Sequence, residues 1–370
     1  MGDIYANATL TVAATWSHSS DSGLFSKIST DLKAASLSAT GIFVRPKIPT
    51  FPYRHNQNSG YWPLLHRAWV YQERKLSSRV VHFGKDQLYW ECNSGFEAED
   101  GSEKYSAGSL KLKSTLAEPD QDWRHAVEHY SWLNLTFEKD RLPAISAVVK
   151  RMQPLRPNDV YVAGVWTSSL LHDLTWFALE GYRYPRRLDS SGPSWSWISA
   201  SSGVSFIPSM RRLPSVRLEL TYSITGPTHF GESRDARVKF RGPALTVQVL
   251  ERDNGFHDLR LFESRDLHKG LENLTLRFKG HEDFDFGTAE PPIVPGSSLL
   301  LLLYYYQHIG PHPIPGGMIV RPMVGGTYQR VGSTFWNRYR WYNADKGSEE
   351  EASSLLEKVQ ALPFKEYIIV

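Results

Sequence analysis

One short segment, Trp69-Val70-Tyr71-Gln72-Glu73-Arg74, carries the residues best suited to chemistry. Helical spacing from Tyr61 places Gln72 inside an apolar stripe and Glu73 at its edge. A carboxyl group at such an edge is partly desolvated, which raises its pKa and suits it to proton transfer. The structural interpretation is that Glu73 forms an ion pair with Arg67 or Arg74 that orients the helix, and we favour it. Gln72 needs a hydrogen-bond partner inside its stripe.

Three further groups of residues have types that can bind or react. Trp195 and Trp197 can form a platform for a sugar ring, but alternate tryptophans at the start of a predicted sheet favour a core position. Residues 282–285 resemble paired carboxylates, although a solvated turn between strands is the favoured interpretation. His125 and His129 share a predicted helix without the glutamate of a metalloprotease motif, and we interpret them as facing solvent. No phosphate loop, dinucleotide glycine pattern or nucleophile elbow occurs, so no cofactor and no metal are expected.

The elements that position these residues change in type along the chain. We expect, in order, a strand at 9–15, a helix at 61–74, a hairpin at 80–92, an exposed insertion at 93–119, helices across 120–180 and antiparallel strands from 194 onward. The chain is therefore expected to be α+β, with a boundary near residues 186–193.

Composition restricts the class of protein. The 370 residues carry a net charge of +3 and 41% hydrophobic residues, which is typical of a globular chain without a nucleic-acid footprint. Cys92 is the only cysteine, which favours a reducing compartment. Residues 1–20 lack a signal-peptide pattern, and the apolar run Leu299–Tyr306 is far shorter than a membrane helix. We expect a cytoplasmic protein without a membrane span or a nucleic-acid partner.

Several of these segments resemble the fungal heterokaryon-incompatibility (HET) family. The opening block Met1-x-x-Ile4-Tyr5-x-x-Ala8 leads into a strand and a serine-rich loop that ends in Gly23-Leu24-Phe25. The segment Arg67-x-Trp69-x-x-Gln72-Glu73 is similar to the one that closes the family's domain, and Trp90 follows within a family-like strand. Further similar stretches lie at 140–146, 161–166, 193–197, 317–322 and 328–332.

The resemblance implies a division of the chain into four parts. They are the C-terminal part of a HET domain at 1–92, an exposed insertion at 93–119, a helical accessory region at 120–190 and a β-rich C-terminal domain at 191–370. The family's Leu-Ser-Tyr-x-Trp-Gly and Trp-Ile-Asp-x-Leu-Cys-Ile-x-Gln blocks do not occur, so the chain is expected to begin partway into that domain. Residues 1–92 are then a partial α/β remnant similar to a TIR or flavodoxin-like fold.

The resemblance also implies a function. We expect non-self recognition and incompatibility-linked cell death, carried out through contacts with other proteins and without a complete active site. One alternative is a TIR-like hydrolase that cleaves NAD with Glu73 as its key carboxylate. A second alternative is a carbohydrate-binding β module at 194–345, suggested by its tryptophan and tyrosine content. The motif residues are Tyr5, Arg67, Trp69, Gln72, Trp90, Trp195 and Trp197.

Overall fold

The chain forms two compact units, Met1–Pro157 and Asn158–Val370. The computed structural model describes residues 1–27, 29–37, 41–52, 60–106, 118–179, 192–252, 259–264, 276–283, 289, 291–309, 312–334, 342–343, 356–357 and 359–370. The division falls at 157/158 and differs from the predicted boundary at 190/191, which lies outside the described residues. The difference arises because residues 158–179 are held by hydrogen bonds to later strands, such as that from Tyr304 Oη to the Leu174 carbonyl.

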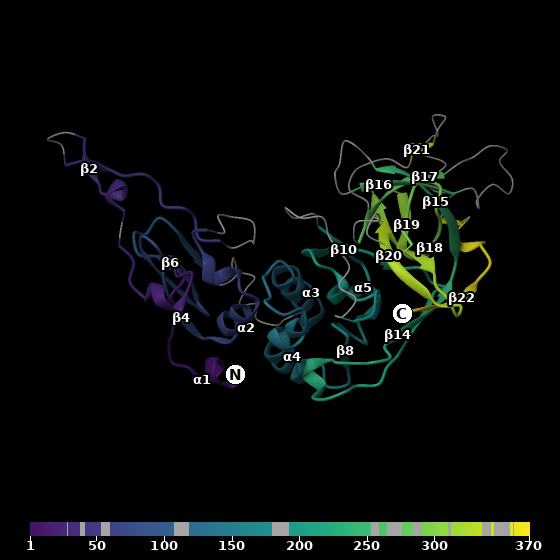
Figure 1. Ribbon diagram of the computed structural model, residues 1–370, viewed down its shortest axis with the longest axis horizontal. Coiled ribbons are helices and arrows are strands. Elements are labelled where there is room, and N and C mark those ends of the chain that lie inside the picture. The colour runs from purple at the N-terminus through teal and green to yellow at the C-terminus, as the bar shows by residue number, and fades with distance from the viewer. Residues whose placement is uncertain are drawn as a thin grey trace. The chain divides into compact units, whose positions relative to one another are not determined.

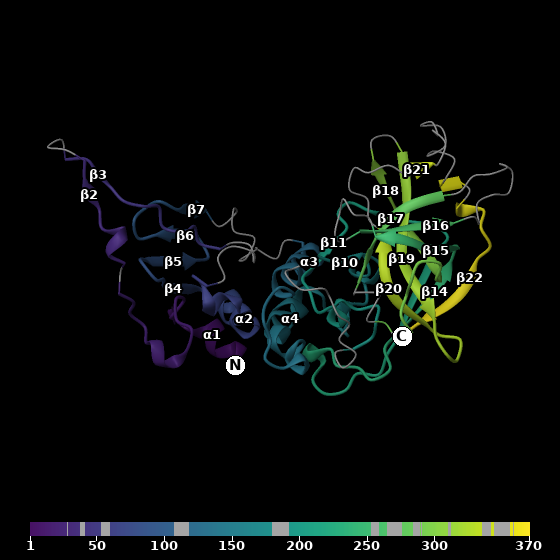
Figure 2. The ribbon, with the colours of Figure 1, turned by 45° about the horizontal axis from the view of Figure 1, so that its top comes forward.

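The first unit is built on a five-stranded sheet with one buried face. Its strands are, in spatial order, β1 (Thr11–Ala13), β4 (Arg79–Phe83), β5 (Leu88–Cys92), β6 (Gly95–Ala98) and β7 (Lys104–Ser106), and β4 to β7 are stacked in this order in Figure 2. β1 runs parallel to β4, and the other pairs are antiparallel. The buried face packs Tyr89, Phe96 and Ala98 against Phe51 and Trp62. The predicted hairpin at 80–92 is present as β4 and β5.

Short helices accompany this sheet. They are α1 (Gly2–Asn7), α2 (Ala68–Leu76), α3 (Pro119–Tyr130) and α4 (Ser146–Met152), with 3-10 turns η3 (Pro63–His66), η6 (Glu138–Asp140) and η7 (Pro143–Ile145) among them. A hairpin of β2 (Ala35–Ser36) and β3 (Phe43–Val44) forms a separate small sheet.

Two predictions for this unit are wrong. The helix does not run from residue 61, because Arg67 is extended between η3 and α2 and bridges to Asn134. The Asn134 amide donates to the His66 carbonyl at 2.7 Å, and the Ala68 amide donates to the Asn134 carbonyl at 3.0 Å. Residues 95–106 are not an exposed insertion either, because β6 and β7 extend the sheet and bury Phe96.

Residues 158–179 and 192–206 open the second unit, and short strands replace most of the predicted helix at 160–180. They form β8 (Tyr161–Val162), β9 (Val165–Trp166), the single turn α5 (Leu170–Asp173), β10 (Trp176–Ala178), the 3-10 turn η9 (Trp197–Ser199) and β11 (Val204–Phe206). Ala163 and Gly164 have φ of 49° and 84°, which ends any helix and turns β8 onto β9. The helical prediction was wrong because apolar content alone does not distinguish a buried helix from buried strands.

A large, mostly antiparallel sheet completes the second unit (Figure 1). Its strands are β12 (Arg211–Arg212), β13 (Arg217–Thr221), β14 (Arg237–Gly242), β15 (Ala244–Arg252), β16 (Leu259–Ser264), β17 (Leu276–Glu282), β18 (Ser298–Ile309), β19 (His312–Pro322), β20 (Tyr328–Thr334), β21 (Tyr342–Asn343) and β22 (Lys365–Ile369). The path β20-β19-β18-β15-β16-β17 closes on itself, because β17 also pairs with β20. The chain is therefore a mixed α and β protein rich in antiparallel strands, as expected. None of the helices in the described ranges has the length and apolar composition needed to cross a bilayer.

Candidate functional site

Helix α2 lies at the centre of the first unit, and its side chains reach segments far away in the sequence. Trp69 Nε1 donates to Asp140 Oδ2, at the end of η6, at 3.4 Å. Gln72 is buried, and its Oε1 accepts a hydrogen bond of 3.3 Å from the amide of Ala147 at the start of α4. The buried amide thus has the partner that its place in an apolar stripe requires.

Glu73, the candidate catalytic residue, lies beside Tyr5 of α1. Burial raises the pKa of the Glu73 carboxyl, while the hydrogen bond from the Tyr5 hydroxyl and the charge of Arg67 lower it. Burial and the neighbouring Glu73 raise the pKa of Tyr5 as well. Burial thus makes the Glu73 carboxyl a better proton acceptor than an exposed glutamate. The exposed Arg67 acts on Glu73 through its charge.

Arg74 does not pair with Glu73, so that part of the structural interpretation is wrong. Arg74 Nε instead donates to Glu91 Oε2 on β5 at 2.6 Å, and the guanidinium lies over the Phe51 ring at 5.1 Å. The Arg74 side chain points toward Glu91 because the Glu91 side chain is inside the unit and only 1% exposed. A buried carboxylate needs a buried or half-buried cation to remain charged.

Glu91 also takes part in a series of buried polar contacts that was not predicted from the sequence. Glu91 Oε2 lies 3.0 Å from His82 Nε2, and His82 Nδ1 lies 3.0 Å from Thr15 Oγ1. A hydroxyl, an imidazole and a carboxylate in this order have the connectivity of a hydrolase triad. Thr15 is 0% exposed and His82 is 1% exposed, so no substrate reaches this hydroxyl and the trio is structural. The sequence did contain a signal for this contact, because His82 and Glu91 occupy inward positions of a hairpin with alternating apolar and polar residues.

Lys75 lies near these charges at the end of α2. Burial lowers the pKa of its ammonium group to about 8, while the carboxylates of Asp122 and Glu91 oppose the shift. The first unit therefore holds two ionisable groups two residues apart on α2, Glu73 and Lys75, whose pKa values move toward neutrality from opposite directions.

Trp90 lies on the opposite face of the sheet from this network. Val12, Val81 and Trp90 are paired across β1, β4 and β5, so their side chains form one row on the open face. Val12 is 53% exposed and Trp90 is 40% exposed, while Val81 is half-buried. We call these three residues the open-face row.

Trp195 and Trp197 lie in the second unit and are 0% exposed. The Trp195 carbonyl accepts a hydrogen bond of 2.8 Å from Trp176 Nε1, and Trp197 Nε1 donates to the Gly164 carbonyl at 2.6 Å. Gly164 is required here, because a Cβ atom would lie 2.8 Å from Trp197 Nε1. Neither indole ring is available to stack on a sugar.

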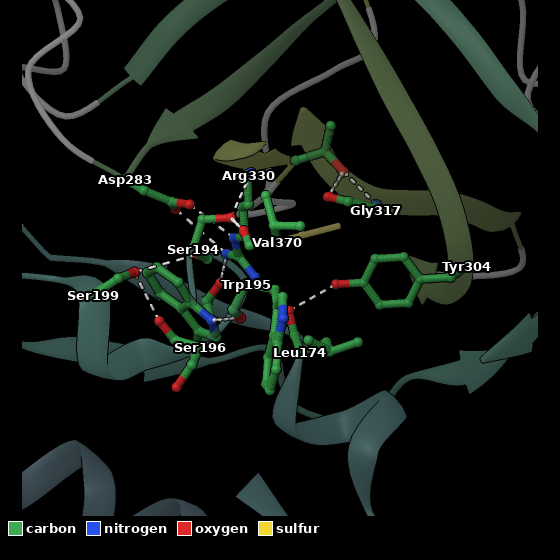
Figure 3. A network of polar contacts seen from close by, with 12 residues as sticks. Leu174, Ser194, Trp195, Ser196, Ser199, Asp283, Tyr304, Gly317, Arg330 and Val370 are labelled. Atoms are coloured by element: carbon green, nitrogen blue, oxygen red, sulfur yellow. Dashed lines mark hydrogen bonds and ion pairs between the residues drawn. The ribbon is translucent and has the colours of Figure 1, made fainter. Parts of the chain in front are cut away.

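Arg330 organises a second buried polar network, in the region of Trp195 (Figure 3). Its Nε donates to Asp283 Oδ2 at 2.7 Å, and its other nitrogens donate to the carbonyls of Leu174, at 2.8 Å, and Trp176. The guanidinium also lies 3.8 Å from the centroid of the Trp176 ring. Asp283 is 4% exposed, so the solvated-turn interpretation is wrong for this residue, and Phe284 and Asp285 lie outside the described residues.

The first unit thus brings Tyr5, Trp69, Gln72 and Glu73 together, whereas Trp90 is on the other sheet face and the Trp195–Trp197 segment belongs to the second unit. Among the residues that the structure describes, no group of three His, Cys, Asp or Glu side chains is placed to hold a metal ion. Comparisons of the chain with protein-family models, curated proteins and solved structures find no match.

Proposed function

We propose that this chain is a HET-family protein that acts in non-self recognition and incompatibility-linked cell death through contacts with other proteins. The supporting observation is the convergence of separate family-like segments on one helix. Tyr5 of the opening block contacts Glu73, and Trp69 contacts Asp140 of a downstream block. Segments that were matched independently in the sequence therefore belong to one packed assembly, as parts of a single domain would.

The parallel pair β1 and β4 supports the finer part of the proposal, a remnant of a TIR or flavodoxin-like fold. α2 lies between these two strands in the sequence, so β1, α2 and β4 have the order of a βαβ unit. Parallel strands of such folds are normally covered on both faces. Here Val12 of β1 is exposed on the open face of the sheet.

The open-face row is the proposed contact surface. Apolar side chains in a row on an open sheet face gain free energy when another protein covers them. Trp90 is the largest of the three, and tryptophan is enriched among the residues that dominate binding energy. We therefore propose that a partner protein with an apolar surface binds this face. We propose the cytoplasm as the compartment, because Cys92 is the only cysteine and a chain without disulfides is typical of a reducing environment.

Induced expression in a fungal host tests the proposal. We expect growth arrest with the unaltered chain and loss of arrest with Trp90→Ser at equal protein abundance. Phe137→Ser is the matched control, because Phe137 is an aromatic residue of the same unit that is more exposed than Trp90, at 58% against 40%. Normal growth with the unaltered chain, or arrest that persists in Trp90→Ser, would contradict the proposal.

The raised pKa of Glu73 favours one second candidate, cleavage of NAD. A carboxyl whose pKa is raised by burial can accept the proton of the water that attacks the ribose as neutral nicotinamide leaves. Incubation of the purified chain with NAD, followed by measurement of free nicotinamide, tests this candidate. It predicts release that Glu73→Gln abolishes, and it is rejected by no release or by release that survives the substitution.

A further inference from the structure

The hairpin of β2 and β3 forms an arm that stands apart from the sheet of its unit (Figures 1 and 2). We define the arm as residues 30–37 and 41–47. Ala35 pairs with Val44 and Ser36 pairs with Phe43, and the Leu37 amide donates to the Ile42 carbonyl at 2.9 Å. The structure does not describe residues 38–40.

The arm exposes large apolar side chains on both of its faces. Leu37, Ile42, Phe43 and Val44 are 63%, 56%, 64% and 45% exposed. Phe43 and Val44 are consecutive residues of one strand, so they point to opposite faces. A flat partner surface would cover only one of these faces, whereas a fluid apolar medium covers both.

The two ends of the arm are fixed to the body of the first unit. Before the arm, Ser26 Oγ donates to the Gly84 carbonyl at 3.4 Å, and the Ser29 amide donates to Asp86 Oδ1 at 3.4 Å. After it, Ile48 is 6% exposed and Phe51 is fully buried in the core. The arm is therefore presented from a packed base, so little conformational entropy is lost when it binds.

The arm and the residues next to it carry more positive than negative charge. Residues 27–47 contain Lys27, Lys33, Arg45 and Lys47 but only one acid, Asp31, which gives +4 − 1 = +3, as much as the net charge of the whole chain. All four cations are exposed, and Arg45 is also paired with Asp100. Apolar residues in and beside the two strands, with cations toward the base, complement a lipid surface that is apolar inside and anionic at its headgroups.

We propose that the arm binds the surface of anionic membranes by inserting Leu37, Ile42, Phe43 and Val44 among the lipid chains while its cations contact the headgroups. A second copy of this chain is the less favourable occupant, because each arm would bring its own cations to the other. This inference does not depend on the proposed role in incompatibility.

Flotation of the full chain with lipid vesicles tests the inference. We expect binding to vesicles of phosphatidylcholine and phosphatidylserine, little binding to phosphatidylcholine alone, and weaker binding as salt is raised. Phe43→Ser should weaken binding by about tenfold or more, because the lipid no longer covers a phenyl ring. Lys33→Gln and Lys47→Gln should each weaken it about fivefold.

Controls separate these effects from loss of folding. Phe137→Ser, which removes an exposed aromatic residue outside the arm, should bind as the unaltered chain does. Circular dichroism should be unchanged in all variants, because the substituted side chains are exposed. Equal binding to both vesicle types, or no binding to either, would overturn the proposal. So would a concentration-dependent dimer, measured by light scattering, that Phe43→Ser dissociates, since the arm would then contact a second copy.

Discussion

At the scale of single residues, α2 holds a carboxyl whose protonation affects stability. Burial raises the pKa of Glu73 in the folded chain above its value in the unfolded chain. The folded state therefore binds more protons than the unfolded state between the two pKa values, and the free energy of unfolding falls as pH rises through this range. This contribution to stability is fully present at pH values below the Glu73 pKa of the unfolded chain, which is near the ordinary glutamate value. It is lost at pH values above the Glu73 pKa of the folded chain.

Glu73→Gln should remove this pH dependence and keep an acceptor for the Tyr5 hydroxyl. We expect the variant to equal or exceed the unaltered chain in stability at pH 7, by less than about 1.4 kcal/mol because the group is only half-buried. Urea unfolding at a series of pH values from mildly acidic to neutral measures the slope. A variant that keeps the original slope would show that another group is responsible, and Glu97→Gln, at an exposed site on the open face, is the control.

At the scale of elements, local sequence patterns predicted those helices and strands whose packing or hydrogen-bond partners are near in the sequence. The hairpin at 80–92 was predictable from its alternation around Gly84, and Gln72 was predictable as a buried amide that needs a partner. The break at Arg67 was not, because it depends on Asn134, which no local pattern connects to it. Propensity and periodicity describe single segments, whereas such bridges are set by tertiary packing.

The same limit explains the errors in charge pairing and in strand assignment. Arg74 has Glu73 beside it in the sequence, but it pairs with Glu91, because only that carboxylate is buried and needs a cation. Phe96 was hidden in a polar stretch, so its strand was predicted as an insertion. Asp283 and Arg330 are far apart in the sequence, and their pairing depends on β17 and β20 being neighbours, which the sequence does not reveal.

At the scale of the whole molecule, each compact unit contains a buried charge network of its own. The first unit holds Arg74, Glu91 and His82, and the second holds Arg330 and Asp283. Breaking a buried pair by removing one partner leaves an uncompensated charge, which destabilises a protein by about 3–5 kcal/mol. Because the ion pairs described for each network lie within one unit, each network is expected to stabilise its own unit.

Arg330→Met should therefore accelerate backbone hydrogen exchange in peptides from 158–370 and leave those from 1–157 unchanged. The methionine leaves Asp283 buried without its cation and the carbonyls of Leu174 and Trp176 without their guanidinium donors. Glu91→Gln should have the reciprocal effect, because it removes the charge that Arg74 and His82 contact. Exchange followed by mass spectrometry measures both units in one experiment, and Arg330→Lys, which keeps the charge but not the planar fork, should have a smaller effect. If either substitution accelerates exchange equally in both ranges, the two units unfold as one cooperative body and the expectation of separate stability is wrong.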